Sequence, residues 1–387
     1  NLLIQELQSF AYDVLIISGD IYDRSIPPLE AISLFDDFLT RVHTEFPNLQ
    51  ICFISGNHDS QKRLSFGSNF FRSQHIYICT EPADCIQPVL LQHAGCVQAA
   101  LYQIPFLHAG SLTSNSAHGL KTQQELVNEA ITRILEAHAL LQKSENAYEN
   151  LPALLNCHLF TIGAISCDSE RIFIGTAEAV GSDLFAPFAY TAIGHLHKSQ
   201  KVTDRAYYAG SPLAYSFSEA KHEKSFLRIT LDDACEKKND SMPGVSVTKI
   251  PIVPIHRMIQ TESSFEDFEN LTDYKNDFIE FVCTDSVLTE NAAARLRKHF
   301  PFLLSVKQKA LELYTNRSND NLKKKKLLPE NPEAQSLREI LYAFLEDIGL
   351  AEQSESGEKH DEWEKEADLF ENIARELAKK EAFFEAP

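Results

Sequence analysis

Two short stretches near the start of the chain decide its fold: VLIISGD at residues 14–20 and ICFISGNHD at residues 51–59. Each is an apolar run as long as a buried strand, and each ends in a glycine followed by polar residues. Two later runs end in the same way, ALLNCH at residues 153–158 and YTAIGHLH at residues 190–197. Helical patterns lie between the strands, for example at residues 28–45. This alternation predicts an α/β fold.

The side chains at the ends of these runs are of types that bind metal ions. They are Asp20, Asn57, His58, Asp59, His158, His195 and His197. Ligands at the carboxyl ends of sheet strands converge on one crevice, so we expect these side chains to meet there. His195 and His197 lie two positions apart, so in an extended chain their rings point to the same side. A mixture of Asp, Asn and His suits Mn²⁺ or Fe²⁺ better than Ca²⁺ or a thiolate zinc site.

Glycine precedes three of these groups, at Gly19, Gly56 and Gly194. Glycine lets the backbone turn tightly, so we expect each to turn the chain just before a ligand. The eight cysteines contain no C-x-x-C pair, which argues against a zinc ribbon or a thiol redox site. No apolar run reaches the roughly 18 to 20 residues of a membrane-spanning helix.

The order GD, GNHD, H and GHLH resembles the calcineurin-like metallophosphoesterase superfamily. The stretches GDIYDRSIPP, GNHDSQKRLSFGS and YYAGSPLAYSFSEAKHEKSF are similar to those of the SbcD family, the nuclease subunits of bacterial SbcC–SbcD complexes. The resemblance implies an α/β sandwich of β-sheets flanked by helices. It also implies a nuclease domain at residues 1–240, a small α/β capping domain at 241–326 and partner-binding amphipathic helices at 327–387.

The resemblance implies a role for each ligand and two bound Mn²⁺ ions, with Mg²⁺ or Fe²⁺ as alternatives. Asp20 matches the carboxylate that bridges the two ions. Asn57, His158 and His195 match the other ligands of one ion, and His197 matches a ligand of the second.

His58 matches a histidine that does not bind metal. In the family it stabilises developing charge or protonates the leaving oxygen of the phosphate. Asp59 orients that imidazole or its loop, or has a purely structural role; the residues alone leave these alternatives open.

The family's D-x-H motif, which supplies two further ligands to the second ion, does not occur before Asp20. The chain begins with Asn rather than Met, so we expect a first strand carrying D-x-H to precede it in the native protein.

The implied reaction is metal-assisted hydrolysis of DNA phosphodiesters: 3′→5′ exonuclease action on duplex ends and endonuclease action on single strands and hairpins. The implied setting is DNA repair, replication and recombination in the bacterial cytoplasm at the nucleoid. The implied assembly contains two SbcC ATPase and two SbcD subunits, with a homodimer of this chain. Two alternatives stay open: a phosphatase or phosphodiesterase on the same scaffold, and an inactive scaffold if D-x-H is truly absent.

Net charge is −19, which taken alone disfavours nucleic acid as a partner. Residues 327–387 carry 6 basic and 17 acidic side chains, a net of −11, so the rest of the chain carries only −8. The body therefore has room for a local basic surface. Basic residues that follow the ligand motifs are candidates for contacts with DNA phosphates. They are Lys62, Arg63, Arg72, Lys198 and Arg205.

Overall fold

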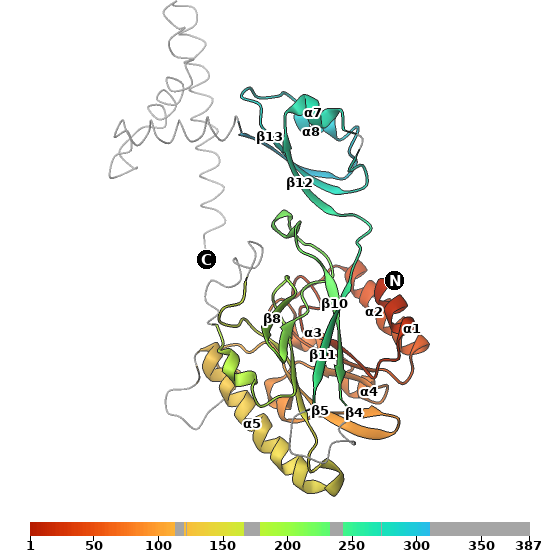
Figure 1. Ribbon diagram of the computed structural model, residues 1–387, viewed down its shortest axis with the longest axis vertical. Coiled ribbons are helices and arrows are strands. Elements are labelled where there is room, and N and C mark those ends of the chain that lie inside the picture. Colours follow the sequence, from red (N-terminus) through yellow and green to blue (C-terminus); the bar gives the residue numbers. More distant parts are fainter. Residues whose placement is uncertain (113–119, 121, 166–178, 233–242, 272, 310–387) are drawn as a thin grey trace, which may run out of the picture. The chain divides into compact units, whose positions relative to one another are not determined.

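The computed structural model of the 387-residue chain describes all residues except 113–119, 121, 166–178, 233–242, 272 and 310–387 (Figure 1). The chain divides into two compact units. The first consists of Asn1–Gln260 with Asn276–Ile279, and the second is drawn from the rest. Among the described residues, no helix combines the length and the hydrophobicity needed to cross a membrane.

The first unit contains a three-stranded parallel sheet in the order β1-β2-β3. These strands are Val14–Ile17, Gln50–Ile54 and Ile76–Cys79. All five residues of β2 are buried, as expected of a central strand whose two faces are covered.

Helices α1 (Leu2–Ser9) and α2 (Leu29–Glu45) cover one face of this sheet (Figure 1). An apolar cluster joins helices and strands, and its buried members are Ile4, Leu7, Val42, Leu49, Ile51, Phe53 and Ile76. Two short helices, α3 (Gln61–Leu64) and α4 (Ser68–Arg72), separate β2 from β3.

The second sheet has six strands in the order β4-β5-β6-β7-β9-β8, and the pairs from β5 through β6 and β7 to β9 are parallel. The strands are Val89–His93, Cys96–Ile104, Ala153–His158, Tyr190–Gly194, Gln200–Thr203 and Ala206–Tyr208, from β4 to β9. Short 3₁₀ helices are Pro82–Ile86, Asn146–Tyr148, Ser182–Phe185 and Phe217–Glu219.

Helix α5 (Gln123–Ser144) packs on this second sheet. It begins with a capping box, in which Thr122 accepts from the amide of Glu125 and the Glu125 side chain accepts from the amide of Thr122. This arrangement satisfies amides that a helix start otherwise leaves unpaired. Helix α5 buries Leu126, Val127, Ala130, Ile131 and Ile134 against the sheet.

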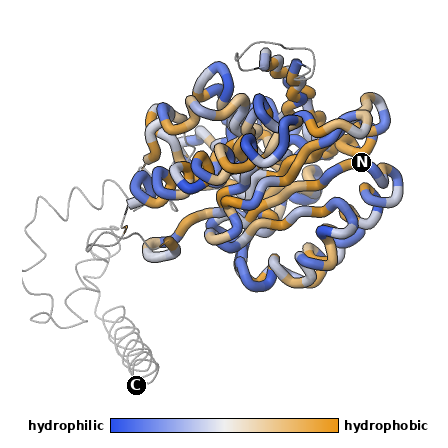
Figure 2. The backbone as a smooth tube through the Cα atoms, turned by 90° about the horizontal axis from the view of Figure 1, so that it is seen from below, coloured by the Kyte–Doolittle hydropathy of each residue, from blue (hydrophilic) through white to orange (hydrophobic). Residues whose placement is uncertain are grey.

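A further apolar cluster lies between the two sheets. The unit is therefore a layered sandwich, with α1 and α2 outside the three-stranded sheet and α5 outside the six-stranded sheet. The buried members of the cluster between the sheets are Cys52, Val89, Leu91, Ala99, Leu101, Leu154, Ala189 and Tyr190. The antiparallel pair β10 (Ser225–Leu231) and β11 (Val245–Pro251) adds Ile229 and Val247 to the same cluster. Figure 2 shows hydrophobic residues concentrated along the strands and hydrophilic ones in the outer loops.

A further three-stranded sheet has the order β12-β13-β14, with bounds Met258–Ser263, Phe278–Cys283 and Leu303–Gln308. Helices α7 (Phe265–Glu269) and α8 (Ala292–Leu296) accompany it. Phe268 stacks on Phe281 and Phe300 at centroid distances of 4.2 and 4.6 Å. This mixture of helices and strands agrees with the small α/β module that the sequence predicts here; the capping role stays a prediction.

Candidate metal centre

The predicted ligands lie where the two sheets of the first unit meet. Strands β1 and β2 of one sheet and β6 and β7 of the other each lead directly into one of them. Both strand pairs are parallel, so their carboxyl ends lie at the same edge of each sheet. This is the crevice that the sequence predicts.

Four side chains surround one point in this crevice. Ligand atoms of Asp20, His158 and His195 all lie within 4.8 Å of one another. Oδ1 of Asn57 lies 3.0 Å from Nε2 of His158 and 3.1 Å from Nδ1 of His195. Nε2 of His158 lies 3.3 Å from Oδ2 of Asp20. An oxygen and nitrogen set of this kind suits a divalent cation of intermediate hardness.

His158 is buried and its ring is held in one orientation. Its Nδ1 donates to the backbone carbonyl of Ser18 at 2.7 Å, which leaves Nε2 for the centre of the site. Burial alone lowers the pKa of His158, but the neighbouring Asp20 carboxylate outweighs burial and the pKa is raised. Burial likewise raises the pKa of Asp20, and His158 outweighs that effect, so the pKa is lowered. The carboxylate therefore favours positive charge at this point, as a cation site requires.

His195 supplies the clearest sign that the residues fit a metal ion. Its Nε2 is buried and has no hydrogen-bond partner among the described residues. Burial, together with the charge of His158, lowers the pKa of His195 to about 3, so the ring is neutral near pH 7. A neutral imidazole keeps the lone pair that a metal needs. An unpaired buried nitrogen is costly unless something else binds the ring.

Two of the ligands have unusual backbone conformations. Asp20 has φ +50° and His195 has φ +103°, values that residues with a side chain adopt rarely. Such conformations cost roughly 1 to 3 kcal/mol each and persist where the surrounding structure enforces them.

The glycines before the ligands are required for space as well as for turning. A side chain at Gly56 would overlap the carboxylate of Asp20, and one at Gly194 would overlap the carbonyl of Ser18. The sequence predicts tight turns at these positions, and the structure adds the close approach of neighbouring ligand loops.

Asp59 joins two of the ligand loops. Its carboxylate accepts from the amides of Gly56 at 2.9 Å and of Ile21 and Tyr22 at 3.0 Å each. Burial raises its pKa, and these three hydrogen bonds act in the opposite direction. Of the roles left open by the sequence, the contacts favour positioning of the loops.

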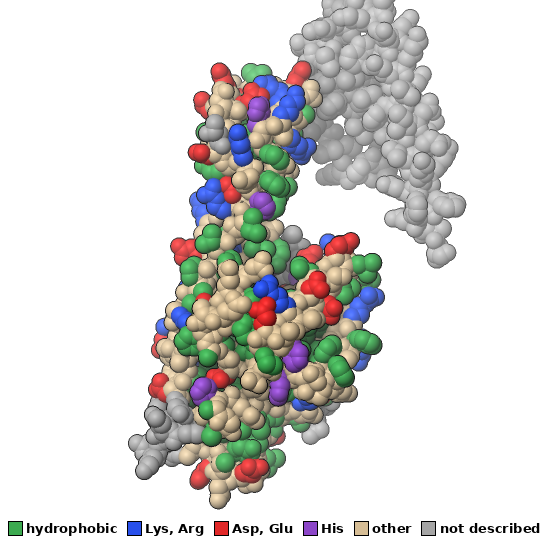
Figure 3. Space-filling model, turned by 90° about the vertical axis from the view of Figure 1, so that its right-hand side faces the viewer, with side chains coloured by type: hydrophobic (Ala, Val, Ile, Leu, Met, Phe, Trp, Pro, Cys, Tyr) green, Lys and Arg blue, Asp and Glu red, His purple; other side chains and the backbone are tan. Residues whose placement is uncertain are grey.

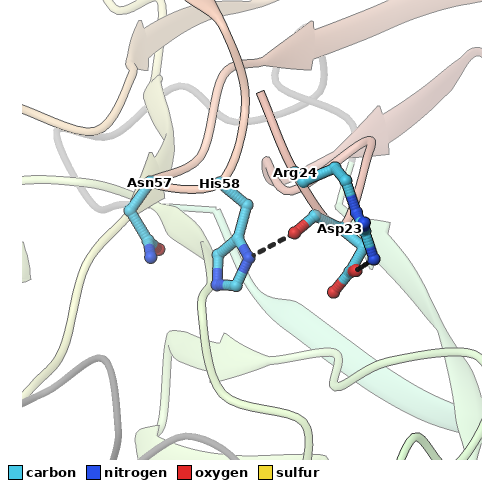
Figure 4. Close-up of a pocket in the computed structure, with 4 residues that line it drawn as sticks. All are labelled: Asp23, Arg24, Asn57 and His58. Carbon is cyan, nitrogen blue, oxygen red and sulfur yellow. Dashed lines mark hydrogen bonds and ion pairs between the residues drawn. The ribbon is translucent and has the colours of Figure 1, made fainter. Parts of the chain in front are cut away.

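His58 lies beside the cluster at an open pocket of about 430 Å³, lined by Asp23, Arg24, Asn57 and His58 (Figure 4). Its backbone amide donates to Oδ1 of Asp20 at 3.1 Å. Its Nδ1 lies 2.8 Å from the carbonyl oxygen of Asp23, which can only accept, so Nδ1 carries the proton. Sequence reasoning missed Asp23 and Arg24, although both belong to the GDIYDRS stretch.

His197 is not one of the three residues, Asp20, His158 and His195, whose ligand atoms lie together. It is held instead by the buried ion pair of Glu219 and Lys224. Its Nδ1 lies 2.9 Å from Oε1 of Glu219, which is fully buried. Lys224 Nζ donates to Oε2 of Glu219 at 2.7 Å and to the His197 carbonyl at 2.9 Å. Burial alone raises the pKa of Glu219, but His197 and Lys224 outweigh it and lower the pKa to about 2. Because an ionised Glu219 accepts from Nδ1, the ring keeps Nε2 for a metal.

Sequence reasoning missed both Glu219 and Lys224. Both occur in the SEAKHEK segment of a stretch that carries the family resemblance. Nothing else in the sequence indicates that these two residues are buried, because they lie five positions apart in a polar segment.

Some of the five basic residues proposed to contact DNA already interact with other residues of the chain. Lys62 pairs with Glu81 at 2.6 Å, and the Arg72 guanidinium lies 5.7 Å from the centroid of the Tyr77 ring. Arg205 donates to the carbonyls of Ala189 and Pro243. Arg63 is exposed and Lys198 is half-buried. On the face of the larger unit in Figure 3, basic side chains are scattered among acidic ones.

Comparison with known proteins agrees with this geometry. Residues 1–198, just over half of the chain, match the family described as calcineurin-like phosphoesterase. The chain therefore belongs to the calcineurin-like phosphoesterase family, and its α/β sandwich is the predicted fold. As a member of this family it is a metal-dependent phosphodiester hydrolase, and the site described above offers the group that would hold a divalent ion.

Two curated relatives, each named as the SbcD component of the nuclease SbcCD, resemble most of the chain. The relative from Staphylococcus saprophyticus is 28% identical over 321 residues, 81% of this chain and 79% of the relative. The relative from Staphylococcus epidermidis is 27% identical over 362 residues, 92% of this chain and 89% of the relative. The chain is therefore similar to SbcD nucleases along most of its length.

Proposed function

We propose that this chain is a nuclease that hydrolyses DNA phosphodiesters with bound Mn²⁺. The observation that carries the proposal is that four side chains with metal-binding atoms meet at one point of the crevice: Asp20, Asn57, His158 and His195. The names of the two Staphylococcus relatives support a nucleic-acid substrate over a small phosphate ester.

Asp20, Asn57, His158 and His195 would hold one ion, and Asp20 and His197 would contribute to a second. Bound divalent ions would polarise the phosphate, neutralise its charge and lower the pKa of a bound water. The protein's own contribution is to hold these ligands before the ion binds, through Ser18, Asp59 and Glu219. Mg²⁺ and Fe²⁺ are alternatives to Mn²⁺ for the same donor atoms.

His58 would act on the substrate rather than on the ion. Its Nδ1 is held by the Asp23 carbonyl, so Nε2 is the atom that exchanges a proton at the pocket. A protonated Nε2 there would stabilise charge on the phosphate or protonate the leaving oxygen. Arg24 lines the same pocket and is a further candidate for a phosphate contact.

The finer activity is taken from the family. We propose 3′→5′ exonuclease action on duplex ends and endonuclease action on single strands and hairpins, in DNA repair, replication and recombination. The scattered basic side chains imply that a partner supplies much of the contact with the DNA backbone.

The relatives are named as components of SbcCD, so we propose that the partner is the SbcC ATPase, in a complex that also pairs two copies of this chain. The amphipathic patterns predicted to bind SbcC fall in residues 327–387, which lie outside the described residues.

The test is cleavage of linear duplex DNA by the purified protein in Mn²⁺, in EDTA, and after Mn²⁺ is restored. We expect cleavage in Mn²⁺ and after Mn²⁺ is restored, and no cleavage in EDTA. ATP should change the rate only when SbcC is present. Rapid hydrolysis of a phosphomonoester with intact DNA would instead favour the phosphatase alternative, and no hydrolysis of either would favour an inactive scaffold.

A further inference from the structure

The segment between β9 and β10 presents two apolar side chains to solvent beside the metal centre. Tyr215 is 62% exposed and Leu213 is 51% exposed. The Tyr215 ring lies against a predicted metal ligand, because its centroid is 5.5 Å from that of His197, at an interplanar angle of 54°. An exposed aromatic ring therefore borders the place where a phosphate would bind.

Hydrogen bonds tie the start of this segment to the metal centre, although two of its apolar side chains are exposed. The amide of Ser211 donates to the His197 carbonyl at 3.1 Å, and the Ser211 hydroxyl donates to the Leu213 carbonyl at 2.7 Å. The buried Lys224 donates to the Ser211 hydroxyl at 2.8 Å as well as to Glu219 and the His197 carbonyl. The ion pair that fixes His197 therefore also holds Ser211, at the start of the segment that carries Tyr215. An ordered aromatic ring loses little conformational entropy when it binds.

The aromatic side chain at this position adds no charge to the approach. Tyrosine is uncharged near neutral pH, so the Tyr215 ring does not repel a phosphate. Tyr215 lies beside His197, and the open pocket lies beside His58, so the ring and the pocket each adjoin a predicted functional histidine of the centre.

We infer that Tyr215 is the subsite on which a nucleobase next to the scissile phosphate stacks. The inference rests on the proposed nuclease function and names the part of the substrate that the metal ions do not contact. In a DNA strand each phosphate is flanked by bases, and base stacking on an aromatic ring tolerates every sequence because every base has a π-face. Such a subsite gives the centre a preference for nucleic acid over small phosphate esters without sequence specificity.

The experiment is a double-mutant cycle between the protein and the strand. Three proteins are compared: the unchanged chain, the Tyr215→Phe variant and the Tyr215→Ala variant. The strand is a labelled single-stranded oligonucleotide, either intact or with a central block of abasic tetrahydrofuran residues. Binding is measured by fluorescence anisotropy and cleavage by gel. Bound Mn²⁺ is counted in each variant.

The unchanged protein and Tyr215→Phe should bind the intact strand about ten-fold or more tighter than the abasic strand, because both keep the ring. Tyr215→Ala should lose most of this preference, bind the abasic strand normally and keep its Mn²⁺. An undiminished preference in Tyr215→Ala, or a loss of Mn²⁺ that accounts for weak binding, would overturn the subsite. If the preference is as expected but only phosphomonoesters are hydrolysed, the nuclease proposal fails and the subsite stands.

Discussion

Nδ1 of His158 lies 2.7 Å from the backbone carbonyl oxygen of Ser18, although the two residues are 140 positions apart. His158 ends β6 of the six-stranded sheet, and Ser18 follows β1 of the three-stranded sheet. The orientation of a metal ligand in one sheet is thus set by the backbone of the other. The geometry of the centre depends on how the two sheets pack.

Replacing His58 should separate chemistry from metal binding. We expect His58→Ala to keep its metal content and to lower the cleavage rate about 10²- to 10⁴-fold, the usual contribution of a general acid or base. The matched variant His195→Ala should lose metal, because it removes one of the three side chains whose ligand atoms lie within 4.8 Å of one another. Elemental analysis and cleavage assays check both. Loss of metal from His58→Ala would show that His58 is a ligand.

A methyl group at Gly56 should disturb the centre without removing a ligand. In Gly56→Ala the added carbon would overlap the Asp20 carboxylate, so we expect Mn²⁺ affinity to fall by about ten-fold or more. Gly95→Ala is the control, since Gly95 has φ +81° and open space around it. It should lose roughly 1 kcal/mol of stability from backbone strain and keep its Mn²⁺ affinity. Equal Mn²⁺ titrations for the two variants would contradict the steric argument.

Removal of Lys224 should destabilise the fold more than removal of the whole ion pair. Lys224→Met leaves the fully buried Glu219 without its cation, which typically costs about 3 to 5 kcal/mol of unfolding free energy. Glu219→Gln combined with Lys224→Met removes both charges and should recover part of that loss. Urea unfolding of the single and double variants measures it. A double variant that is less stable than Lys224→Met would argue against this assignment.

Glu219 should also make stability depend on acid. Its pKa is about 2 in the folded chain against an ordinary value of 4.5, so the unfolded chain takes up a proton first as pH falls. The contribution is therefore fully present above pH 4.5 and is lost between about pH 4.5 and 2, with an upper size of about 3 kcal/mol. Urea unfolding at pH 6, 4 and 3 should show a shallower pH dependence in Glu219→Gln. The same dependence in both proteins would mean that Glu219 is not ionised.

The sequence predicts those parts of the fold in which local pattern and environment agree. Strands β1, β6 and β7 each begin at the first residue of the apolar run that predicts them, because these runs are compact and rich in apolar residues. The nine-residue strand β5 was not predicted. Its sequence CVQAALYQI mixes small and polar residues, and Gln103 is buried there by its neighbours rather than by its own hydrophobicity.

The centre follows the same rule. The sequence predicts the four ligands that meet in the crevice, because each ends an apolar run at the same edge. Glu219 and Lys224 were not, since a Glu and a Lys in a polar segment read as solvated. Their burial depends on His197, 22 positions before Glu219, and no local pattern records that contact.

The left-handed backbone at Asp20 and the positive φ of His195 have a consequence for fragments of this chain. Short synthetic peptides that copy SGD, GNHD or GHLH would relax to ordinary conformations and turn these ligands away from one another. Such peptides should therefore chelate Mn²⁺ no better than scrambled ones. In the whole protein, release of the ion would accompany the first loosening of the two sheets, which makes bound Mn²⁺ an early spectroscopic reporter of unfolding.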